Sequence, residues 1–244
     1  MKLVSLNVEG ERHWGDVIPL LEREDPDIIC LQEVFELSLE NIHALGYSSI
    51  FSPTTVMERG GVFSEFGIAI CTKNSIHDHK VFPYDSNTDR VTYYNDSQKS
   101  ETVLSNILII SVKHGQEGYL IGTTHFTWAP DGAHPSPEQE QDMALFLKTV
   151  SKFPPHVMCG DFNIPRGVNP LYDKLMQVYT DEIPQHYTSS LDPDKHHLGN
   201  NPDLAVLFDE YMVDYILSQP PYRATNVRLE FGISDHAAVI GTIC

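Results

Sequence analysis

The 244-residue chain carries 16 Lys and Arg residues against 34 Asp and Glu residues, so its formal net charge at pH 7 is −18. Such a charge argues against broad, salt-dependent binding along a nucleic-acid backbone, which requires a surface rich in Lys and Arg. The sequence contains neither a signal-peptide pattern nor an apolar run of membrane-spanning length. We therefore expect a cytoplasmic globular protein without a membrane anchor, and no feature indicates an obligate protein partner.

The first third of the chain alternates short apolar runs with helical patterns. Residues 1–8 are predicted to form a buried strand. An amphipathic helix follows, with Asp16 as its expected N-cap and Pro19 in its first turn, where proline is tolerated. A short second helix ends at Gly46, and residues 53–66 are expected to form a glycine-bearing loop. Further strands are predicted at residues 28–31, 47–52, 67–71 and 76–82.

The rest of the chain continues this alternation around two long irregular segments. Residues 84–102 and 181–208 are polar and lack a period, which predicts loops. Ser136 begins a capping box with proline at the first helical position, and Asn169 is the expected cap of another helix. Strands are predicted at residues 103–112, 119–124, 211–217, 227–231 and 237–243.

Both halves of the chain mix strands with helices, and the strands outnumber the helices. No change in composition and no Ser- or Gly-rich linker divides the sequence. We therefore predict one α/β domain over residues 1–244, with sheets in the core and helices outside them.

The sequence Gly160-Asp161-Phe162-Asn163 follows a short apolar run that is predicted to be a buried strand. Residues two apart in a strand point to the same face, so Asp161 and Asn163 are expected to emerge side by side. A carboxylate beside a carboxamide suits a hydrated divalent cation and a phosphate. By itself the motif fits an Asx turn at a strand end equally well.

Several other predicted strands also end in polar residues. A single polar residue at such a position, for example His125, is more often a hydrogen-bonded strand residue than a ligand. Polar residues at the ends of several predicted strands are better explained by one functional site to which all of them contribute. The residues concerned are Asn7 with Glu9, Glu33, His125, Asp161 with Asn163, Asp214, and Asp235 with His236.

These residues lie in motifs that resemble the ordered motifs of the endonuclease/exonuclease/phosphatase superfamily. The resemblance extends from residue 3 to about residue 240. It implies a four-layer α/β sandwich, in which two packed mixed β-sheets are flanked by helices on both outer faces. The motifs are Ser5-Leu-Asn-Val-Glu9, Leu31-Gln-Glu33, Thr124-His125, Gly160-Asp-Phe-Asn163, Val213-Asp-Tyr-Ile216 and Ser234-Asp-His236.

The resemblance implies a Mg²⁺ site. Asn7 and Glu33 would hold the metal, with Glu33 as the main ligand, and Asp235 would lie in or just behind the metal shell. Glu9 stands where many members of the family carry aspartate, so its longer side chain is expected to reach the metal only through water. Oxygen ligands and neutral amides without a thiolate cluster favour Mg²⁺ or Mn²⁺ over zinc.

The resemblance also implies the catalytic residues. Asp161 and Asn163 would position the attacking water and the phosphate. His236 would contact the scissile phosphate and would be oriented by Asp214, so these two side chains are expected to be hydrogen-bonded. His125 would bind another phosphate oxygen. Whether Asp161 or His236 takes the proton from water is left open by the sequence.

The function that follows is Mg²⁺-dependent hydrolysis of a phosphoester by in-line attack of water. The motifs at Asn7, Glu33 and His125 are similar to those of the tyrosyl-DNA phosphodiesterase branch, although Ser105 replaces an expected arginine. Processing of nucleic-acid ends fits the acidic composition better than binding of a long duplex.

The alternatives are a sphingomyelinase-like enzyme, a small-molecule phosphodiesterase or phosphatase, a catalytically dead binding module, and a structural domain with coincidental polar residues.

Three segments beyond the strand ends are expected to surround the site and to select its substrate. Trp128 lies in one of them, either as a stacking platform for a base or as a rim aromatic. His196 and His197 are predicted to be solvated. The three segments are residues 53–66, 84–102 and 126–136.

Overall fold

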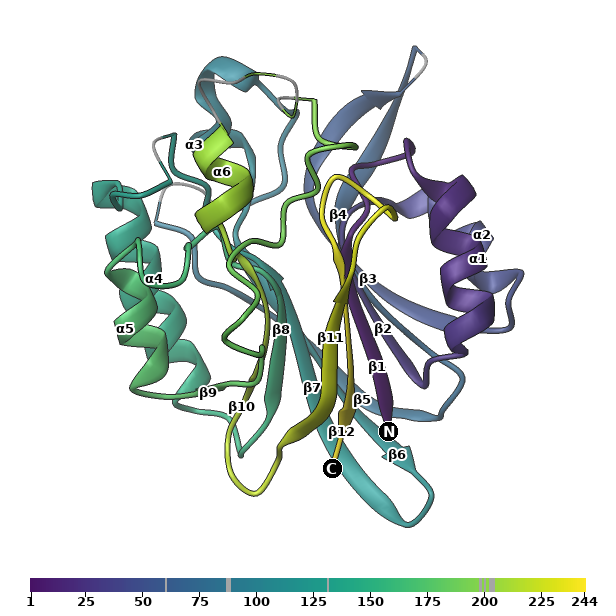
Figure 1. The fold of residues 1–244 in the computed structure, drawn as a ribbon. Coiled ribbons are helices and arrows are strands. Elements are labelled where there is room, and N and C mark those ends of the chain that lie inside the picture. The colour runs from purple at the N-terminus through teal and green to yellow at the C-terminus, as the bar shows by residue number, and fades with distance from the viewer. Residues whose placement is uncertain (60, 87–88, 131, 198, 200, 202–204) are drawn as a thin grey trace.

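The computed structural model describes residues 1–244 except residues 60, 87–88, 131, 198, 200 and 202–204. Two six-stranded β-sheets pack against each other (Figure 1). The first sheet has the order β11-β12-β1-β2-β4-β3 and consists of β1 (Lys2–Asn7), β2 (Ile28–Phe35), β3 (Ser48–Arg59), β4 (Val62–Thr72), β11 (Ala224–Glu230) and β12 (Ala238–Ile243). The second has the order β5-β6-β7-β8-β10-β9 and consists of β5 (Ile76–Pro83), β6 (Asn106–His114), β7 (Glu117–His125), β8 (Val157–Asp161), β9 (Thr180–Asp181) and β10 (Asp214–Ser218).

Both sheets are mixed. Strands β1 and β2 pair in parallel in the first sheet, and β7 and β8 pair in parallel in the second. The other neighbouring strands pair antiparallel. Parallel neighbours end at the same edge of a sheet, so the carboxyl ends of β1, β2, β7 and β8 can present side chains to one place.

Helices cover the outer faces of the two sheets and complete the predicted four layers (Figure 1). The first sheet is covered by α1 (Trp14–Glu24) and α2 (Glu40–His43), which follows the 3₁₀ helix η1 (Glu36–Leu39). The second is covered by α4 (Pro137–Val150) and α5 (Leu171–Met176). Three short helices lie near the upper end of the molecule in Figure 1, namely η2 (Asp96–Gln98), α3 (Lys99–Thr102) and α6 (Ala205–Glu210). No described helix is both long and apolar enough to cross a membrane.

The central strands β1 and β2 of the first sheet are buried on both faces, which explains their nearly continuous apolar runs. In β1, Leu3 belongs to the apolar cluster between the sheets, whereas Val4 and Leu6 belong to the cluster under α1 and α2. Neighbouring residues of a strand face opposite sides, so every residue of such a run enters one core or the other. Each fully buried aliphatic side chain stabilises the fold by about 1.5–3 kcal/mol.

The prediction of a loop at residues 53–66 is wrong, because residues 53–59 belong to β3 and residues 62–66 to β4, and these two long strands pair with each other. Proline and glycine made the segment resemble a loop. Pro53 is tolerated in β3 because it lies at an irregularity, where the pairing register shifts between Pro53 and Thr55. The predicted irregularity of residues 84–102 and 181–208 holds in large part, interrupted by the short elements η2, α3, β9 and the start of α6.

The start of α1 also differs from the prediction. The helix begins at Trp14 after His13, so Asp16 lies in its first turn and is not the N-cap. Pro19 lies inside the helix, where it cannot donate a hydrogen bond to the carbonyl of Gly15. Gly15 and Pro19 are exposed, and water can therefore replace the missing donor. Ser136 is the N-cap of α4 as expected, and its Oγ accepts from the Gln139 N–H. The N-cap of α5 is Pro170, and Asn169 lies one residue before it, where its Oδ1 accepts from the Leu171 N–H.

Candidate active site

Asp161 is the buried centre of the site and ends strand β8, with only 2% of the residue exposed. The parallel pairing of β7 and β8 places His125 beside Asp161, with His125 Nε2 3.5 Å from Asp161 Oδ2. Gly160 makes this close approach possible. A Cβ atom on Gly160 would lie 2.0 Å from the carbonyl oxygen of Thr124, and its φ of 136° is one that other residues rarely adopt.

Asn163 lies next to Asp161, but strand alternation does not place it there. Strand β8 ends at Asp161, and Asn163 has a left-handed φ of 50°. The Asn163 N–H donates to Asp161 Oδ1 at 2.8 Å, which closes an Asx turn. The Asn163 side-chain amide donates to the carbonyl of Phe126 at 2.8 Å, so it also fixes the chain that follows β7.

Glu33 reaches the site because β2 is irregular near its end. The pairing of β2 with β4 shifts register between Leu31 and Val34, and Glu33 has a φ of 54°. Such an irregularity redirects a side chain that would otherwise follow the strand. The amide of Asn7, at the end of β1, donates to Glu33 Oε1 at 3.1 Å and to Asp161 Oδ2 at 3.3 Å. Asn7 therefore bridges the carboxylates of Glu33 and Asp161. The side-chain oxygen of Asn7 accepts the backbone N–H of Glu9 at 3.1 Å, which fixes the orientation of the amide.

The expected contact between Asp214 and His236 is confirmed. Asp214 begins β10, and its Oδ2 lies 2.7 Å from Nδ1 of His236. The hydroxyl of Ser190 donates to the same carboxylate oxygen at 2.6 Å. His236 therefore turns Nε2 toward the centre, 3.8 Å from Asp161 Oδ2. A histidine held at one nitrogen and presenting the other is arranged for proton transfer or for contact with an anion.

Ser190 was not predicted from the sequence, although its segment supports both Asp214 and His236. The carbonyl of Ser190 accepts the Ala237 N–H at 2.7 Å, and Leu191 forms an isolated β-bridge with His236. The Asp192 N–H donates to the carbonyl of Asp235 at 2.8 Å. This segment lies within the irregular stretch 181–208, where no period or motif distinguishes one small polar residue from the next.

The charged groups of the site shift one another's pKa values. Burial would raise the pKa of Glu33, but the His125 ring, the Asn7 amide and the Lys99 ammonium lower it below its ordinary value. Burial, together with the nearby Asp214, raises the pKa of Asp161. Burial opposes a charge on His236, but Asp214 and Asp161 outweigh it and raise the pKa of His236 well above its ordinary value.

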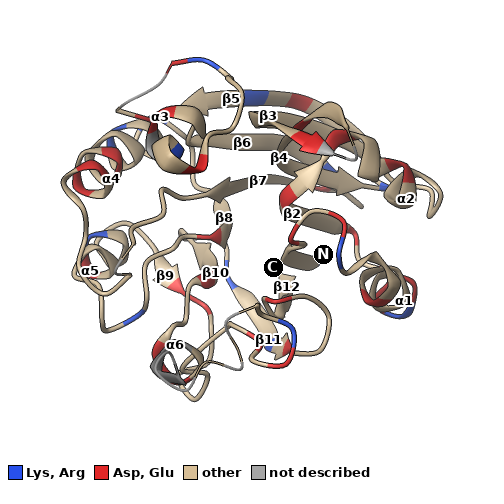
Figure 2. Cartoon of the chain, turned by 90° about the horizontal axis from the view of Figure 1, so that it is seen from above, with Lys and Arg blue, Asp and Glu red and all other residues tan. Residues whose placement is uncertain are grey.

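The donor set fits a hard divalent cation. Glu33 and Asp161 both lie within hydrogen-bond distance of the one Asn7 amide nitrogen, and Asp235 lines the same cleft. Figure 2 shows acidic residues at the ends of β8 and β10, near the middle of the molecule as seen from above. Carboxylates gathered in this way repel one another unless a cation or a proton intervenes. Oxygen ligands of this kind suit Mg²⁺ or Mn²⁺.

Among the described residues, two groups of side chains are close enough to hold a metal ion. One consists of Asp161, Asp214 and His236, which were all predicted as site residues. The other groups Asp235 with Glu9 and His13. The Glu9 carboxylate is also engaged by His13 Nε2 at 2.9 Å and by Arg12. The second group thus adds an imidazole, an unpredicted donor, beside the predicted ligand Asp235.

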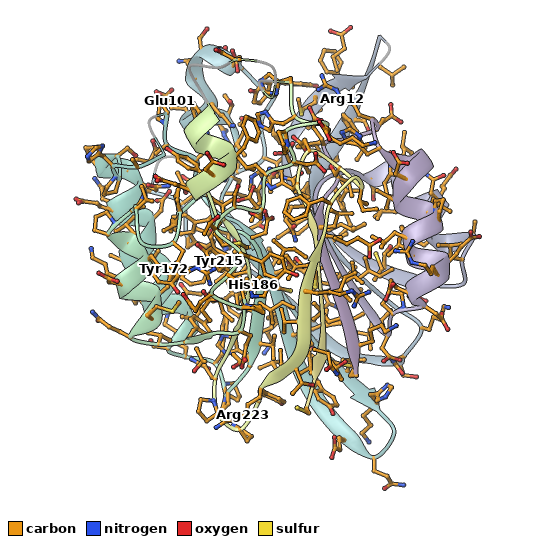
Figure 3. All side chains as sticks on the ribbon, viewed as in Figure 1. Arg12, Glu101, Tyr172, His186, Tyr215 and Arg223 are labelled. Atoms are coloured by element: carbon orange, nitrogen blue, oxygen red, sulfur yellow. The ribbon has the colours of Figure 1, made fainter. Side chains whose placement is uncertain are left out.

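The predicted residues lie in or beside a cleft of about 890 Å³. Segments 84–102 and 126–136 contribute to its lining, as expected, but none of the described residues of segment 53–66 lines it. His196 and His197 line it instead, and His196 is half-buried, so the prediction of two solvated histidines is wrong for His196. Figure 3 shows Arg12 and Glu101 on opposite sides of this end of the molecule.

Residues 4–236 match the model of the Endonuclease/Exonuclease/phosphatase family. None of the curated proteins that were compared matches the chain.

Solved structures with the same fold cover almost the whole chain at low sequence identity. An endonuclease/exonuclease/phosphatase family protein from Leptotrichia buccalis C-1013-b has a TM-score of 0.72 and 17% identity, covering 100% of this chain and 99% of that one. An AP endonuclease from Archaeoglobus fulgidus has a TM-score of 0.67 and 18% identity, covering 99% and 98%. A mannosyl-6-phosphatase from Bacteroides thetaiotaomicron VPI-5482 has a TM-score of 0.68 and 16% identity, covering 100% and 99%.

Proposed function

Because the chain belongs to the Endonuclease/Exonuclease/phosphatase family, we propose that it is a phosphoester hydrolase that requires Mg²⁺ or Mn²⁺ and uses water as the nucleophile. One observation carries this proposal. Glu33, Asp161 and His236 come from three separate segments of the chain and line one cleft, and Asp214, at the start of β10, holds the His236 ring. Such convergence of a held histidine with several carboxylates is costly for stability and is typical of a reaction site.

We propose that Glu33 and Asp235 hold the metal, with Glu9 nearby. When bound, a divalent cation withdraws charge from a phosphate oxygen and makes phosphorus more open to attack. Asn7 would hold the metal as well, as the sequence predicts, and its amide nitrogen would keep the carboxylates of Glu33 and Asp161 in place, since it donates to both.

The other residues have roles that follow from their geometry. His236 would donate from Nε2 to a phosphate oxygen, while Asp214 and Ser190 keep its ring oriented. Asp161 would accept a hydrogen bond from the attacking water. His125, 3.5 Å from Asp161, would donate to a second phosphate oxygen, and Asn163 would hold the turn that positions Asp161.

The proposed substrate is a compact phosphoester, either a nucleic-acid end such as a tyrosyl-DNA phosphodiester or a small phosphorylated molecule. Lys99 is the only Lys or Arg among the described residues that line the cleft, which supports a substrate with few phosphates. Sphingomyelinase-like activity is the further alternative. We also propose that residues 1–244 act as one domain and that the protein works in the cytoplasm.

The test is a panel of phosphoesters assayed with Mg²⁺, with Mn²⁺ and with a chelator. It contains 4-nitrophenyl phosphate, bis(4-nitrophenyl) phosphate, a 5′-tyrosyl oligonucleotide, an abasic duplex, sphingomyelin, an inositol phosphate and mannose 6-phosphate. We expect metal-dependent release of product from at least one compact or end-located ester.

Glu33→Gln is the matched control, because it keeps the shape of the side chain and removes one charge from a crowded anionic site. We expect this variant to lose more than about 99% of the metal-dependent activity while its thermal stability without metal stays equal or rises. Near-normal turnover of the variant at saturating Mg²⁺ would show that Glu33 is not the main ligand. Absence of hydrolysis across the whole panel would contradict the proposed function.

A further inference from the structure

A second hollow of about 280 Å³ opens beside the catalytic cleft. Its walls come from the irregular segments at residues 96–105 and 126–130, together with single residues from the chain before them and from α4. The two hollows meet at a small set of shared side chains. These are Asp96, Lys99, His125, Trp128 and Pro130.

Lys99 is the first residue of α3 and lies at this junction. The described part of the chain offers its ammonium group no ion pair, unlike Lys73, which pairs with Asp25, and Lys195, which pairs with Asp16. The Lys99 Nζ instead lies 4.6 Å from the centroid of the Trp128 ring. A ring face attracts a cation without neutralising it, so the charge stays available to an anion.

Trp128 gives this cation a defined position. The Trp128 side chain is 46% exposed and lies in the segment that follows His125 at the end of β7. A lysine side chain has many rotamers, and a ring that holds its ammonium group reduces the entropy lost when an anion binds. Lys99 lines the same cleft as Glu33, Asp161 and His236, so its charge faces the catalytic groups.

The second hollow itself is acidic. The carboxylates of Asp85, Asp96, Glu101 and Glu138 are among its lining groups, and Lys99 is the only Lys or Arg among the described ones. A second phosphate entering this hollow would meet like charges at several sides. An uncharged group with hydroxyl or amino donors would instead find acceptors there, with the Trp128 ring as an apolar wall.

We propose that Lys99, held on the ring of Trp128, binds an oxygen of the substrate phosphate, and that the acidic hollow beside it accepts the uncharged or cationic group attached to that phosphate. This inference rests on the proposed function and makes it more specific. The preferred substrate is a phosphoester with a single phosphate and a tail without negative charge. A polyanion that continues through the second hollow is disfavoured.

The first experiment measures binding of inorganic phosphate to the full chain by calorimetry at fixed free Mg²⁺. Lys99→Met keeps the stem that packs on Trp128 and removes the charge, so it should weaken phosphate binding about tenfold. Lys99→Arg should bind within about threefold of the wild type. The matched control is Lys113→Met, because Lys113 is an exposed lysine near the far end of β6 and β7 and should not change the affinity. Equal affinities of Lys99→Met and wild type, or no phosphate binding by the wild type, would overturn the proposal.

The second experiment tests the hollow with glycerol 3-phosphate and 3-phosphoglycerate as competing ligands. They share one phosphate, and only the second carries a carboxylate on its tail. We expect glycerol 3-phosphate to bind at least about fivefold more tightly, and equal or reversed affinities would overturn the assignment of the hollow.

The two proposals fail in different ways. Loss of phosphate affinity in Lys99→Met, with no hydrolysis of any ester by the wild type, would leave the phosphate site standing without the enzyme. Metal-dependent hydrolysis with an unchanged KM in Lys99→Met would support the enzyme and refute the role of Lys99.

Discussion

Asp214 shows how a single side chain can set the chemistry of its neighbour. Its Oδ2 lies 2.7 Å from His236 Nδ1 and accepts the Ser190 hydroxyl at 2.6 Å. This arrangement selects the ring orientation in which Nε2 faces Asp161. The role of Asp214 is therefore to position His236, and substitution should affect turnover more than folding.

Asp214→Asn should lower kcat/KM by a factor of about 10² to 10⁴. The amide keeps the shape of the side chain and can still accept from Ser190, but it presents His236 with a weaker acceptor or with a donor. Ser190→Ala removes only one bond and should cost less than Asp214→Asn. The measurements are kcat/KM and its pH profile for both variants, with urea unfolding to confirm the fold. An Asp214→Asn variant within threefold of the wild type would contradict the positioning role.

At the scale of elements, the site depends on irregular strand ends. Strand β2 turns Glu33 toward Asn7 through a register shift, and β8 reaches β7 closely enough only because residue 160 is glycine. Regular strands would carry the same side chains in other directions, since their faces alternate strictly. The parallel pairs β1–β2 and β7–β8 then bring these ends to one edge.

Gly160→Ala should therefore destabilise the protein strongly, by roughly 3 kcal/mol or more, and should also displace Asp161. The added Cβ would lie 2.0 Å from the carbonyl oxygen of Thr124, in a strained backbone conformation. Gly118→Ala, in β7, is the matched control because no atom lies within 4 Å of the position of its Cβ. The denaturant midpoint of both variants measures the effect. Similar small shifts for the two would refute the claim that β7 and β8 require glycine here.

At the scale of the whole molecule, stability should depend on pH through a histidine far from the catalytic chemistry. His156 is fully buried; its Nδ1 lies 2.9 Å from the carbonyl of Pro154 and its Nε2 2.6 Å from the hydroxyl of Tyr179. The carbonyl can only accept, so Nδ1 carries the proton and Nε2 accepts from Tyr179. Burial lowers the pKa of His156 below its ordinary value.

The folded protein thus takes up a proton at His156 less readily than the unfolded chain does. The contribution of His156 to stability should be complete above the unfolded pKa of about 6.5 and should fall as the pH decreases below it, by at most about 1.4 kcal/mol per pH unit. We expect the free energy of unfolding of wild type minus that of His156→Gln to decrease between pH 7.5 and pH 5. The control is His77→Gln, because His77 is exposed. A pH-independent difference for His156 would contradict this prediction.

The net charge of −18 leads to a second prediction for the whole molecule, together with the presence of only one Lys or Arg among the described residues that line the cleft. Few counterions should be released when a substrate binds. A plot of log kcat/KM against the logarithm of the salt concentration, at fixed free Mg²⁺, should therefore have a slope no steeper than about −1. Activity on short or end-located phosphoesters should exceed activity on intact duplex. A slope several times steeper, together with efficient nicking of plasmid, would indicate a general endonuclease.

The sequence by itself determined the fold class and the order of the polar strand ends, because strand period, caps and short motifs are local properties. The Asp161 and Asp214–His236 motifs could be found in this way, and the structure places them together. The remaining features of the site were decided by the pairing of strands and by the close approach of segments in the folded protein. The redirection of Glu33 and the place of Lys99 on Trp128 depend on contacts between segments distant in the chain. No local pattern encodes such contacts, because each exists only once two sheets have packed and their registers are set.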